Sequence, residues 1–241
     1  MRPAPGAGHV SALPVLLLPL LAVGLSYGLG GVLGADLVAR WRGLDLRRIG
    51  SGNPGATNVY RAAGILPALV VLLWDAGKGW VAVRLPLWMD CEHAALVTSA
   101  CALAVLLGHV HPPWGRRARG GKGVATFLGI LLAFAPMAAA VFALVWAVVF
   151  AARRYVSLAS LLAGAAAVVV WGELAKPGDV LLAWVTGVLA YALVLWRHRE
   201  NIHRLYKGQE HRVTRLRTDG RSTAGKNFTS GHARATARTS G

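Results

Sequence analysis

The residues with the clearest chemical potential lie in one short segment, residues 50–61, between two apolar stretches. Three glycines and a proline oppose a regular helix through this segment. Its side chains offer hydroxyl, amide and guanidinium groups, from Ser51, Asn53, Thr57, Asn58 and Arg61. Backbone N–H groups in a glycine-rich turn can form a concave anion site, and an arginine can bind phosphate through its planar fork of donors. The segment therefore predicts a polar pocket for a phosphate-bearing ligand.

A second glycine-rich segment, Gly-Gly-Lys-Gly at residues 120–123, indicates the same chemistry. It resembles half of a nucleotide-binding P-loop. However, Arg116 stands where that motif needs its first glycine, and Gly123 replaces the magnesium-binding Ser or Thr, so a nucleotide is not expected. The glycine-rich backbone before a helix starting near Val124, together with the Lys122 ammonium, still suits an anion. A basic cytoplasmic loop that follows the positive-inside rule is the alternative.

A third polar cluster follows the last apolar run. His198 and Asn201 are three residues apart and Arg204 is three further on, so a continuing helix would place them on one face. The alternative is an interfacial amphipathic helix whose cations reach lipid phosphates. Ser157 and Ser160 also share a helix face, where their hydroxyls could bond to the helix backbone or contact a substrate.

Asp75 and Lys78 lie within an apolar run, where ionisable side chains are costly unless they are compensated. At a spacing of three residues on a helix, the two side chains can pair with each other. We favour a structural ion pair over a direct part in catalysis.

The elements that must position these residues are membrane helices. Hydrophobic residues make up 55% of the 241-residue chain, charged residues only 15%, and the mean hydropathy is +0.50. Soluble domains are usually more polar. Six apolar runs are read as membrane spans, and they cover residues 13–37, 64–88, 94–108, 127–152, 156–171 and 180–196. The predicted fold class is therefore all-α, a polytopic transmembrane helical bundle.

The charge distribution favours about seven helices over six. Basic residues gather on the cytoplasmic side of membrane proteins, but six crossings would place the basic segments at 40–61 and after residue 197 on opposite sides. A division of the 127–152 run near Pro136 places them on one side, together with the 116–122 loop. Each half would then have only about a dozen residues, so the prediction includes short or re-entrant helices shielded by protein.

We expect three regions along the chain. Residues 1–12 form a short N-terminal extracytoplasmic segment, residues 13–211 the membrane domain, and residues 212–241 a disordered, basic cytoplasmic tail. The net charge of +16 lies partly in this tail, which favours contact with anionic membrane lipids over nucleic acid. Cys91 and Cys101 are too few for a zinc site, so no metal is expected.

Four motifs, in this order, resemble those of the bacterial acyl-phosphate:glycerol-3-phosphate acyltransferases. They are residues 51–61, Gly108-His109 with residues 120–126, residues 153–157, and residues 198–210. The resemblance covers about residues 13–211. It implies a seven-helix inner-membrane enzyme whose motifs face the cytoplasm. The implied reaction moves a fatty acyl group from acyl phosphate to the sn-1 hydroxyl of glycerol 3-phosphate, giving lysophosphatidic acid and inorganic phosphate in phospholipid biosynthesis.

The resemblance also carries expectations about partners and residues. It implies no cofactor, no metal and no acyl-CoA, and it allows functional coupling to the enzyme that makes acyl phosphate. The residues expected at catalytic positions are Ser51, Arg61, Lys122, His198 and Asn201. Those expected to bind substrate are Asn53, Thr57, Asn58, Gly120, Gly121, Ser157 and Arg204.

No Ser-His-acid triad is evident in the sequence, so we expect direct attack on acyl phosphate without an acyl-enzyme. The proton of the glycerol hydroxyl could pass to a substrate phosphate oxygen or to His198, and the sequence is compatible with either acceptor. A transporter of phosphorylated metabolites is the alternative of another class, because Asp75, Lys78 and glycine-broken segments could line a path. A purely structural membrane subunit is a third hypothesis, which leaves residues 51–61 without a role.

Overall fold

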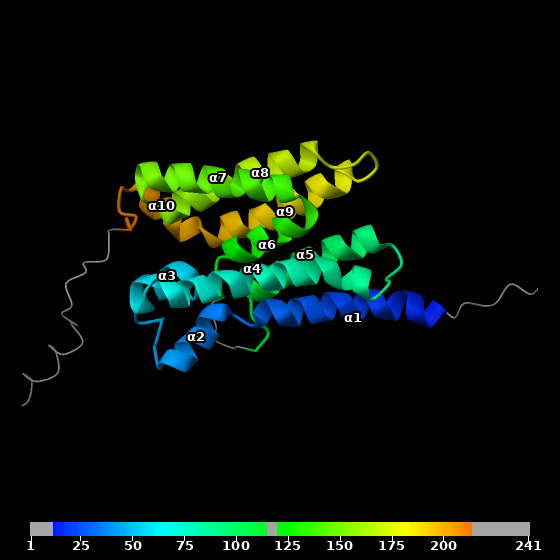
Figure 1. The fold of residues 1–241 in the computed structure, drawn as a ribbon, viewed down its shortest axis with the longest axis horizontal. Helices are drawn as coiled ribbons and strands as arrows, with labels where there is room; N and C mark the ends of the chain where they lie inside the picture. The colour runs from blue at the N-terminus through cyan, green and yellow to red at the C-terminus, as the bar shows by residue number, and fades with distance from the viewer. Residues whose placement is uncertain (1–11, 115–119, 214–241) are drawn as a thin grey trace, which may run out of the picture.

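The computed structural model describes residues 12–114 and 120–213, which form a bundle of α-helices (Figure 1). The helices are α1 (Ala12–Gly31), α2 (Gly34–Arg42), α3 (Ala56–Ala63), α4 (Ile65–Trp88), α5 (Ala94–Val110), α6 (Val124–Phe134), α7 (Pro136–Arg153), α8 (Val156–Glu173), α9 (Val180–Arg197) and α10 (Arg199–Tyr206). The all-α prediction is confirmed for this part of the chain. The expectations for residues 1–11, for the basic loop at 116–119 and for the tail beyond Val213 lie outside the described residues.

Five helical stretches in the described residues are long and apolar enough to cross a membrane. They are Leu16–Arg42, which includes most of α1 and all of α2, and the helices α4, α7, α8 and α9. The shorter apolar helices α5 and α6 bring the number to seven. Many Leu, Val and Trp side chains on these helices are exposed, as a lipid-facing surface requires. The predicted polytopic bundle of about seven helices, short ones included, is confirmed.

The apolar run at 127–152 divides where the sequence predicted. α6 ends at Phe134 and α7 begins at Pro136, a position that suits proline because the first N–H of a helix has no intrahelical partner. The predicted length is wrong for the second half: α7 has 18 residues, and only α6, with 11, is short. α7 reaches this length because Pro136 lies before the middle of the run, so most of the run, from residue 136 to residue 152, follows the break.

The first apolar run is also interrupted, between α1 and α2. Lys78 Nζ donates to Gly30 O (2.9 Å) and Val32 O (3.1 Å), and Gly34 N donates to Asp75 Oδ1 (3.3 Å). Lys78 Nζ lies 2.8 Å from Asp75 Oδ1, so the predicted ion pair is confirmed. Backbone groups that the break leaves without helical partners are thus satisfied inside the bundle.

The helices form two groups with α6 between them. In the first group α1, α4 and α5 pack against one another, in the second α8 packs on α7 and α9, and α6 contacts both groups (Figure 1). α4 and α6 approach closely because Gly79 and Gly129 each lie against a carbonyl group of the other helix. The main hydrophobic core surrounds α6, where Phe127, Ile130 and Leu131 are buried.

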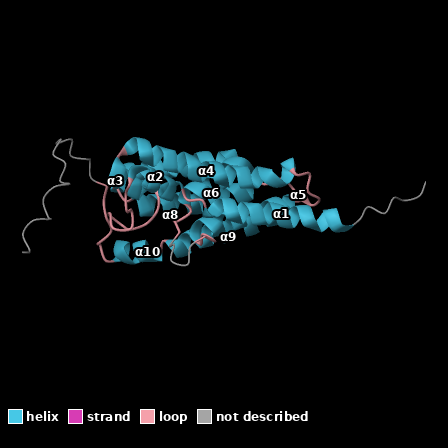
Figure 2. Cartoon of the chain, turned by 90° about the horizontal axis from the view of Figure 1, so that it is seen from below, coloured by secondary structure: helices cyan, strands magenta, loops and turns pink. Residues whose placement is uncertain are grey.

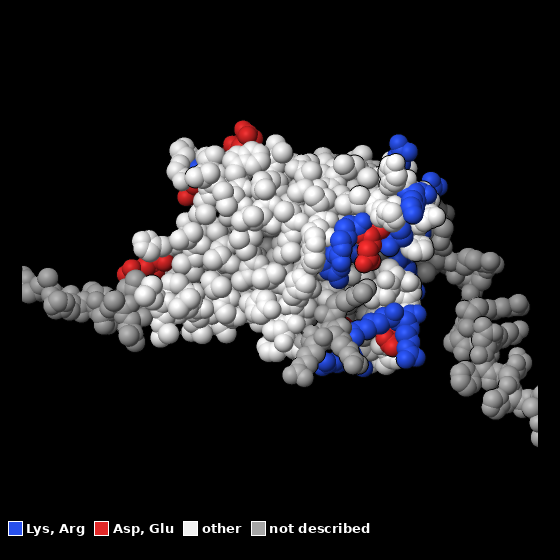
Figure 3. Space-filling view, turned by 180° about the vertical axis from the view of Figure 1, so that it is seen from behind, with Lys and Arg blue, Asp and Glu red and all other residues white. Residues whose placement is uncertain are grey.

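The polar elements gather at one end of the bundle. Helices α2, α3 and α10 lie at this end in two perpendicular views (Figures 1 and 2). Most of the visible Lys and Arg side chains are found there, whereas the middle of this face is uncharged and several acidic side chains lie towards the opposite end (Figure 3). We call this the basic end of the bundle.

Candidate active site

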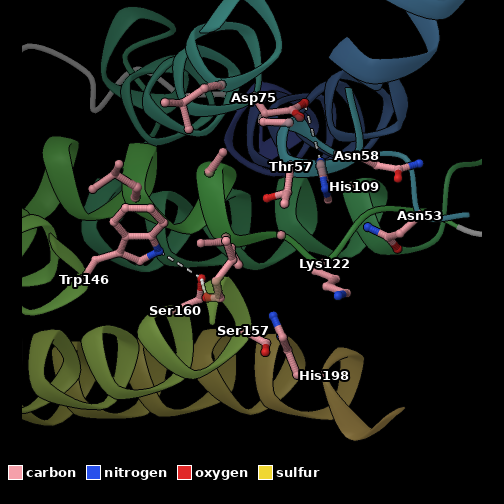
Figure 4. Close-up of a pocket in the computed structure, with 18 of the residues that line it drawn as sticks. Asn53, Thr57, Asn58, Asp75, His109, Lys122, Trp146, Ser157, Ser160 and His198 are labelled. Carbon is pink, nitrogen blue, oxygen red and sulfur yellow. Dashed lines mark hydrogen bonds and ion pairs between the residues drawn. The ribbon is translucent and has the colours of Figure 1, made fainter. Parts of the chain in front are cut away.

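A cavity of about 310 Å³ lies near the basic end and is lined from both helix groups and α6 (Figure 4). Its polar wall is formed by Ser51, Asn53, Thr57, Asn58, Asp75, His109, Lys122, Ser157, Ser160 and His198. Its apolar wall is formed by Leu72, Val124, Ala125, Leu128, Phe142, Ala143, Trp146 and Val156. Of the residues predicted for the site, those that line the cavity are Ser51, Asn53, Thr57, Asn58, Lys122, Ser157 and His198; Arg61, Gly120, Gly121, Asn201 and Arg204 do not line it.

The loop before α3 is folded around the side chain of Asn58. This residue is buried, its Nδ2 donates to Leu46 O (2.9 Å), and its Oδ1 accepts from Ser51 N (3.1 Å). Gly50 and Gly52 have φ values of +56° and +66°, which glycine adopts without strain. The Asn58 amide is therefore engaged with the loop backbone, and it fixes Ser51 at the cavity wall.

Lys122 extends into the cavity from the turn that precedes α6 (Figure 4). Gly123, which ends this turn, has a φ of +80°, and Arg197 Nη2 on α9 donates to Gly120 O (2.8 Å). Burial lowers the pKa of Lys122 to about 8; the Glu210 carboxylate opposes this shift, and three nearby arginines add to it. The ammonium is thus mainly charged at neutral pH and can bind an anion.

His198 lies at the junction of α9 and α10, is 2% exposed, and points into the cavity near Lys122 and Ser157 (Figure 4). Because a carbonyl can only accept, the 2.8 Å contact with Val194 O places the proton on Nδ1 and the lone pair of the neutral ring on Nε2. Burial and the Lys122 charge lower the pKa of His198 to about 4, although the Val194 contact and Glu210 act in the opposite direction. The neutral ring can accept a hydrogen bond from a hydroxyl but is a weak base.

Glu210 is a central residue of the site to which the sequence reasoning gave no role. Its carboxylate accepts hydrogen bonds from Ser157 Oγ (2.8 Å), Asn201 Nδ2 (2.6 Å) and Arg204 Nε (2.8 Å). Burial alone would raise the pKa of Glu210, but these three donors together hold the pKa below its ordinary value. Asn201 and Arg204 are therefore engaged with Glu210 behind the cavity wall. Its position inside the 198–210 motif was the only signal in the sequence.

The other predicted residues outside the cavity wall lie close to its cationic part. Arg61 is on α3 and acts on Lys122 through its charge. Gly120 and Gly121 form the turn that carries Lys122. In contrast, Asp75 and His109 line the cavity although neither was among the predicted site residues.

Comparison with known proteins identifies the family to which this site belongs. The family described as glycerol-3-phosphate acyltransferase matches residues 20–208 of the chain. The chain belongs to the glycerol-3-phosphate acyltransferase family. A glycerol-3-phosphate acyltransferase of Methylobacillus flagellatus is 46% identical over 189 residues, which cover 77% of this chain and 92% of the relative.

Two crystal structures of PlsY (YgiH), an integral membrane glycerol 3-phosphate acyltransferase, share this fold. The glycerol 3-phosphate form has a TM-score of 0.74 and 37% identity, covering 81% of this chain and 96% of PlsY. The lysophosphatidic acid form has a TM-score of 0.73 and 36% identity, covering 81% and 95%. The chain is thus an integral membrane glycerol-3-phosphate acyltransferase, and the transporter and structural-subunit hypotheses are set aside.

Proposed function

We propose that this acyltransferase uses acyl phosphate as its donor and acylates the sn-1 hydroxyl of glycerol 3-phosphate. The products are lysophosphatidic acid and inorganic phosphate, in phospholipid biosynthesis. The observation that carries the proposal is a cavity with Lys122 on a polar wall and an apolar wall on α6 and α7. Such a cavity suits a phosphate on one side and a hydrocarbon chain on the other. PlsY structures in glycerol 3-phosphate and lysophosphatidic acid forms support the same substrate and product.

The cavity supplies donors for substrates that both carry phosphate. The Lys122 ammonium and the side chains of Ser51, Asn53 and Thr57 face it, and Asn58 fixes the loop that carries Ser51 and Asn53. The glycine turn at 120–121 is assigned to phosphate binding through its placement of Lys122. An acyl-CoA donor suits the site less well, because the sequence lacks a nucleotide motif.

In the proposed reaction the glycerol hydroxyl attacks the acyl carbonyl carbon directly. The ester bond forms while the bond from the acyl carbon to the phosphate oxygen breaks, and the phosphate leaves with the electron pair. Lys122 stabilises the negative charge of the substrate and leaving phosphates. A phosphate oxygen, with a second pKa of about 6, is a better proton acceptor than His198, whose pKa is about 4. We therefore assign His198 Nε2 to orienting the hydroxyl.

The remaining predicted residues have supporting roles in this proposal. Asn201 and Arg204 act through Glu210, which holds Ser157 at the cavity wall. Ser157 is not assigned as a nucleophile, because its hydroxyl donates to a carboxylate whose lowered pKa makes it a poor base. Arg61 strengthens the positive potential around the phosphates.

We place this site at the cytoplasmic face of the inner membrane. The support is the concentration of Lys and Arg at the basic end, next to the cavity (Figure 3). Acyl phosphate is a reactive anhydride that another enzyme must supply, so the proposal includes functional coupling to that enzyme.

The test of the donor is phosphate release by the purified protein in detergent, with palmitoyl phosphate, with and without glycerol 3-phosphate, and with no added metal. We expect release that requires both substrates and forms lysophosphatidic acid. Palmitoyl-CoA is tested in parallel. Formation of lysophosphatidic acid from palmitoyl-CoA but not from palmitoyl phosphate would refute the proposed donor.

The role of Lys122 is tested with a matched pair of lysine variants. Lys122→Ala should lower turnover about a hundredfold or more, since charge stabilisation in a water-poor site is a large contribution. Lys207→Ala removes an exposed lysine outside the cavity and should leave turnover unchanged. Equal turnover in the two variants would remove Lys122 from the mechanism.

A further inference from the structure

The imidazole of His109, at the end of α5, is held on one edge by polar groups from two other helices. His109 is buried at the cavity wall. Its Nδ1 lies 3.2 Å from Thr126 Oγ1 on α6 and 3.6 Å from Asp75 Oδ1 on α4. Asp75 is itself fixed by the ion pair with Lys78 at 2.8 Å. The ring therefore has a defined orientation.

The other edge of the ring lies against Gly121. A Cβ added to Gly121 would overlap His109 Nε2 and would lie 2.9 Å from Cε1 and 3.0 Å from Cδ2. The three nearest atoms thus all belong to this imidazole. The backbones are joined as well, because Gly121 N donates to His109 O (3.1 Å). Ring and glycine form one close contact directly next to Lys122.

We propose that His109 is a positioning residue that sets the backbone of the 120–122 turn and thereby the placement of the Lys122 ammonium against the substrate phosphate. Only glycine fits beside the ring, and Asp75 and Thr126 keep the ring in place. This inference rests on the proposed role of Lys122 in phosphate binding.

Fixing the backbone matters because a lysine side chain is long and flexible. Its ammonium is preorganised for an anion only if the Cα that carries it is held in place. A displacement of about 1 Å can cost about a hundredfold in rate. The packed contact between His109 and Gly121 supplies this restraint on the backbone.

The test is a double-mutant cycle on the affinity for glycerol 3-phosphate, measured by titration calorimetry with inorganic phosphate as a second probe. We expect His109→Ala and Gly121→Ala each to raise Kd by about tenfold. The Kd of the double variant should not exceed the higher of the two single-variant Kd values, because the new methyl group occupies space that the ring has left. If the fold-increase in Kd of the double variant equals the product of the two single fold-increases, the inference is overturned. Such a result would show that glycine is required for a reason unrelated to the ring.

A shape-preserving variant keeps the inference testable if His109→Ala does not fold. Thr126→Val removes the hydroxyl that faces the ring and should raise Kd about fivefold. Thr98→Val is the matched control, because Thr98 is a buried threonine on α5 whose hydroxyl has no hydrogen-bond partner among the described residues. The Kd of this variant for glycerol 3-phosphate should not change. A lower melting temperature of Thr126→Val with an unchanged Kd would show a purely structural role and overturn the inference.

This titration needs no acyl donor, so it is separate from the test of acyl phosphate. Lys122→Ala is included in the same series. An unchanged Kd in Lys122→Ala would contradict the proposed phosphate site itself. A raised Kd in Lys122→Ala, together with independent effects of His109→Ala and Gly121→Ala on Kd, would contradict only the role of His109.

Discussion

Raising the pH through 8 should weaken the enzyme, because Lys122 then loses its positive charge. Burial lowers the pKa of this lysine to about 8. Its charged fraction then falls from about 90% at pH 7 to about 10% at pH 9. If only the charged form binds a substrate phosphate, kcat/KM for glycerol 3-phosphate should fall about tenfold over this range.

The sign of the effect follows from the direction of the pKa shift. A lysine with a lowered pKa is charged below that pKa, so activity is present below pH 8 and is lost as the pH rises through it. Bound phosphate favours the charged form and raises the pKa again. The decline of kcat, which reports on the enzyme–substrate complex, should therefore begin at a higher pH than the decline of kcat/KM.

The assay is formation of lysophosphatidic acid between pH 6.5 and 9.5 (a range about 1.5 units either side of the Lys122 pKa), because acyl phosphate hydrolyses on its own and phosphate release would include that background. Glycerol 3-phosphate has its second pKa near 6, so its charge changes little above pH 7. Lys122→Arg provides the control, since a guanidinium stays charged throughout. Its activity should be lower but without the alkaline decline. A flat profile of the unmodified enzyme, or the same decline in Lys122→Arg, would refute the reasoning.

Three further predictions concern Glu210, Gly129 and Ser51. Glu210→Gln should destabilise the protein by about 2 kcal/mol and reduce turnover, because a neutral amide cannot accept from all three donors around it; an unchanged melting temperature would contradict this. Gly129→Ala should lower the melting temperature, because its Cβ would overlap Ala76 O, whereas Gly24→Ala, which meets open space, should not. Ser51→Ala should reduce turnover by less than about a hundredfold, as expected for a hydrogen-bond donor; a loss as large as that of a nucleophile would argue for an acyl-enzyme.

Features that depend on local residue types could be predicted from the sequence. The apolar runs gave the helices, because about 20 apolar residues are needed to cross a bilayer, and Pro136 gave the break between α6 and α7. The glycines at 50, 52 and 55 and the Gly-Gly-Lys-Gly segment at 120–123 gave the loops that reach the cavity. The prediction that the whole of 50–61 is non-helical is wrong, because α3 begins at Ala56, directly after the last of these glycines. Glycine and proline act on the backbone where they stand, so their effect needs no knowledge of the fold.

Contacts between distant residues could not be predicted in the same way. Glu210 meets Ser157 across 53 residues of sequence, and neither hydropathy nor helical spacing indicates that contact. The break between α1 and α2 is equally non-local, because the partners of its backbone groups are the side chains of Asp75 and Lys78. Tertiary packing determines such partners, and a single sequence read locally does not contain it.

The ion pair of Asp75 and Lys78 has a consequence for the insertion of the nascent chain. Its backbone partners, at Gly30, Val32 and Gly34, all precede it in the sequence. When α4 leaves the translocation machinery, the groups that compensate its two charges have therefore already been synthesised, and the first helices can satisfy them before any later helix exists. The cavity, in contrast, needs α8 and His198. The two charges can thus be compensated before the residues that complete the cavity have been synthesised.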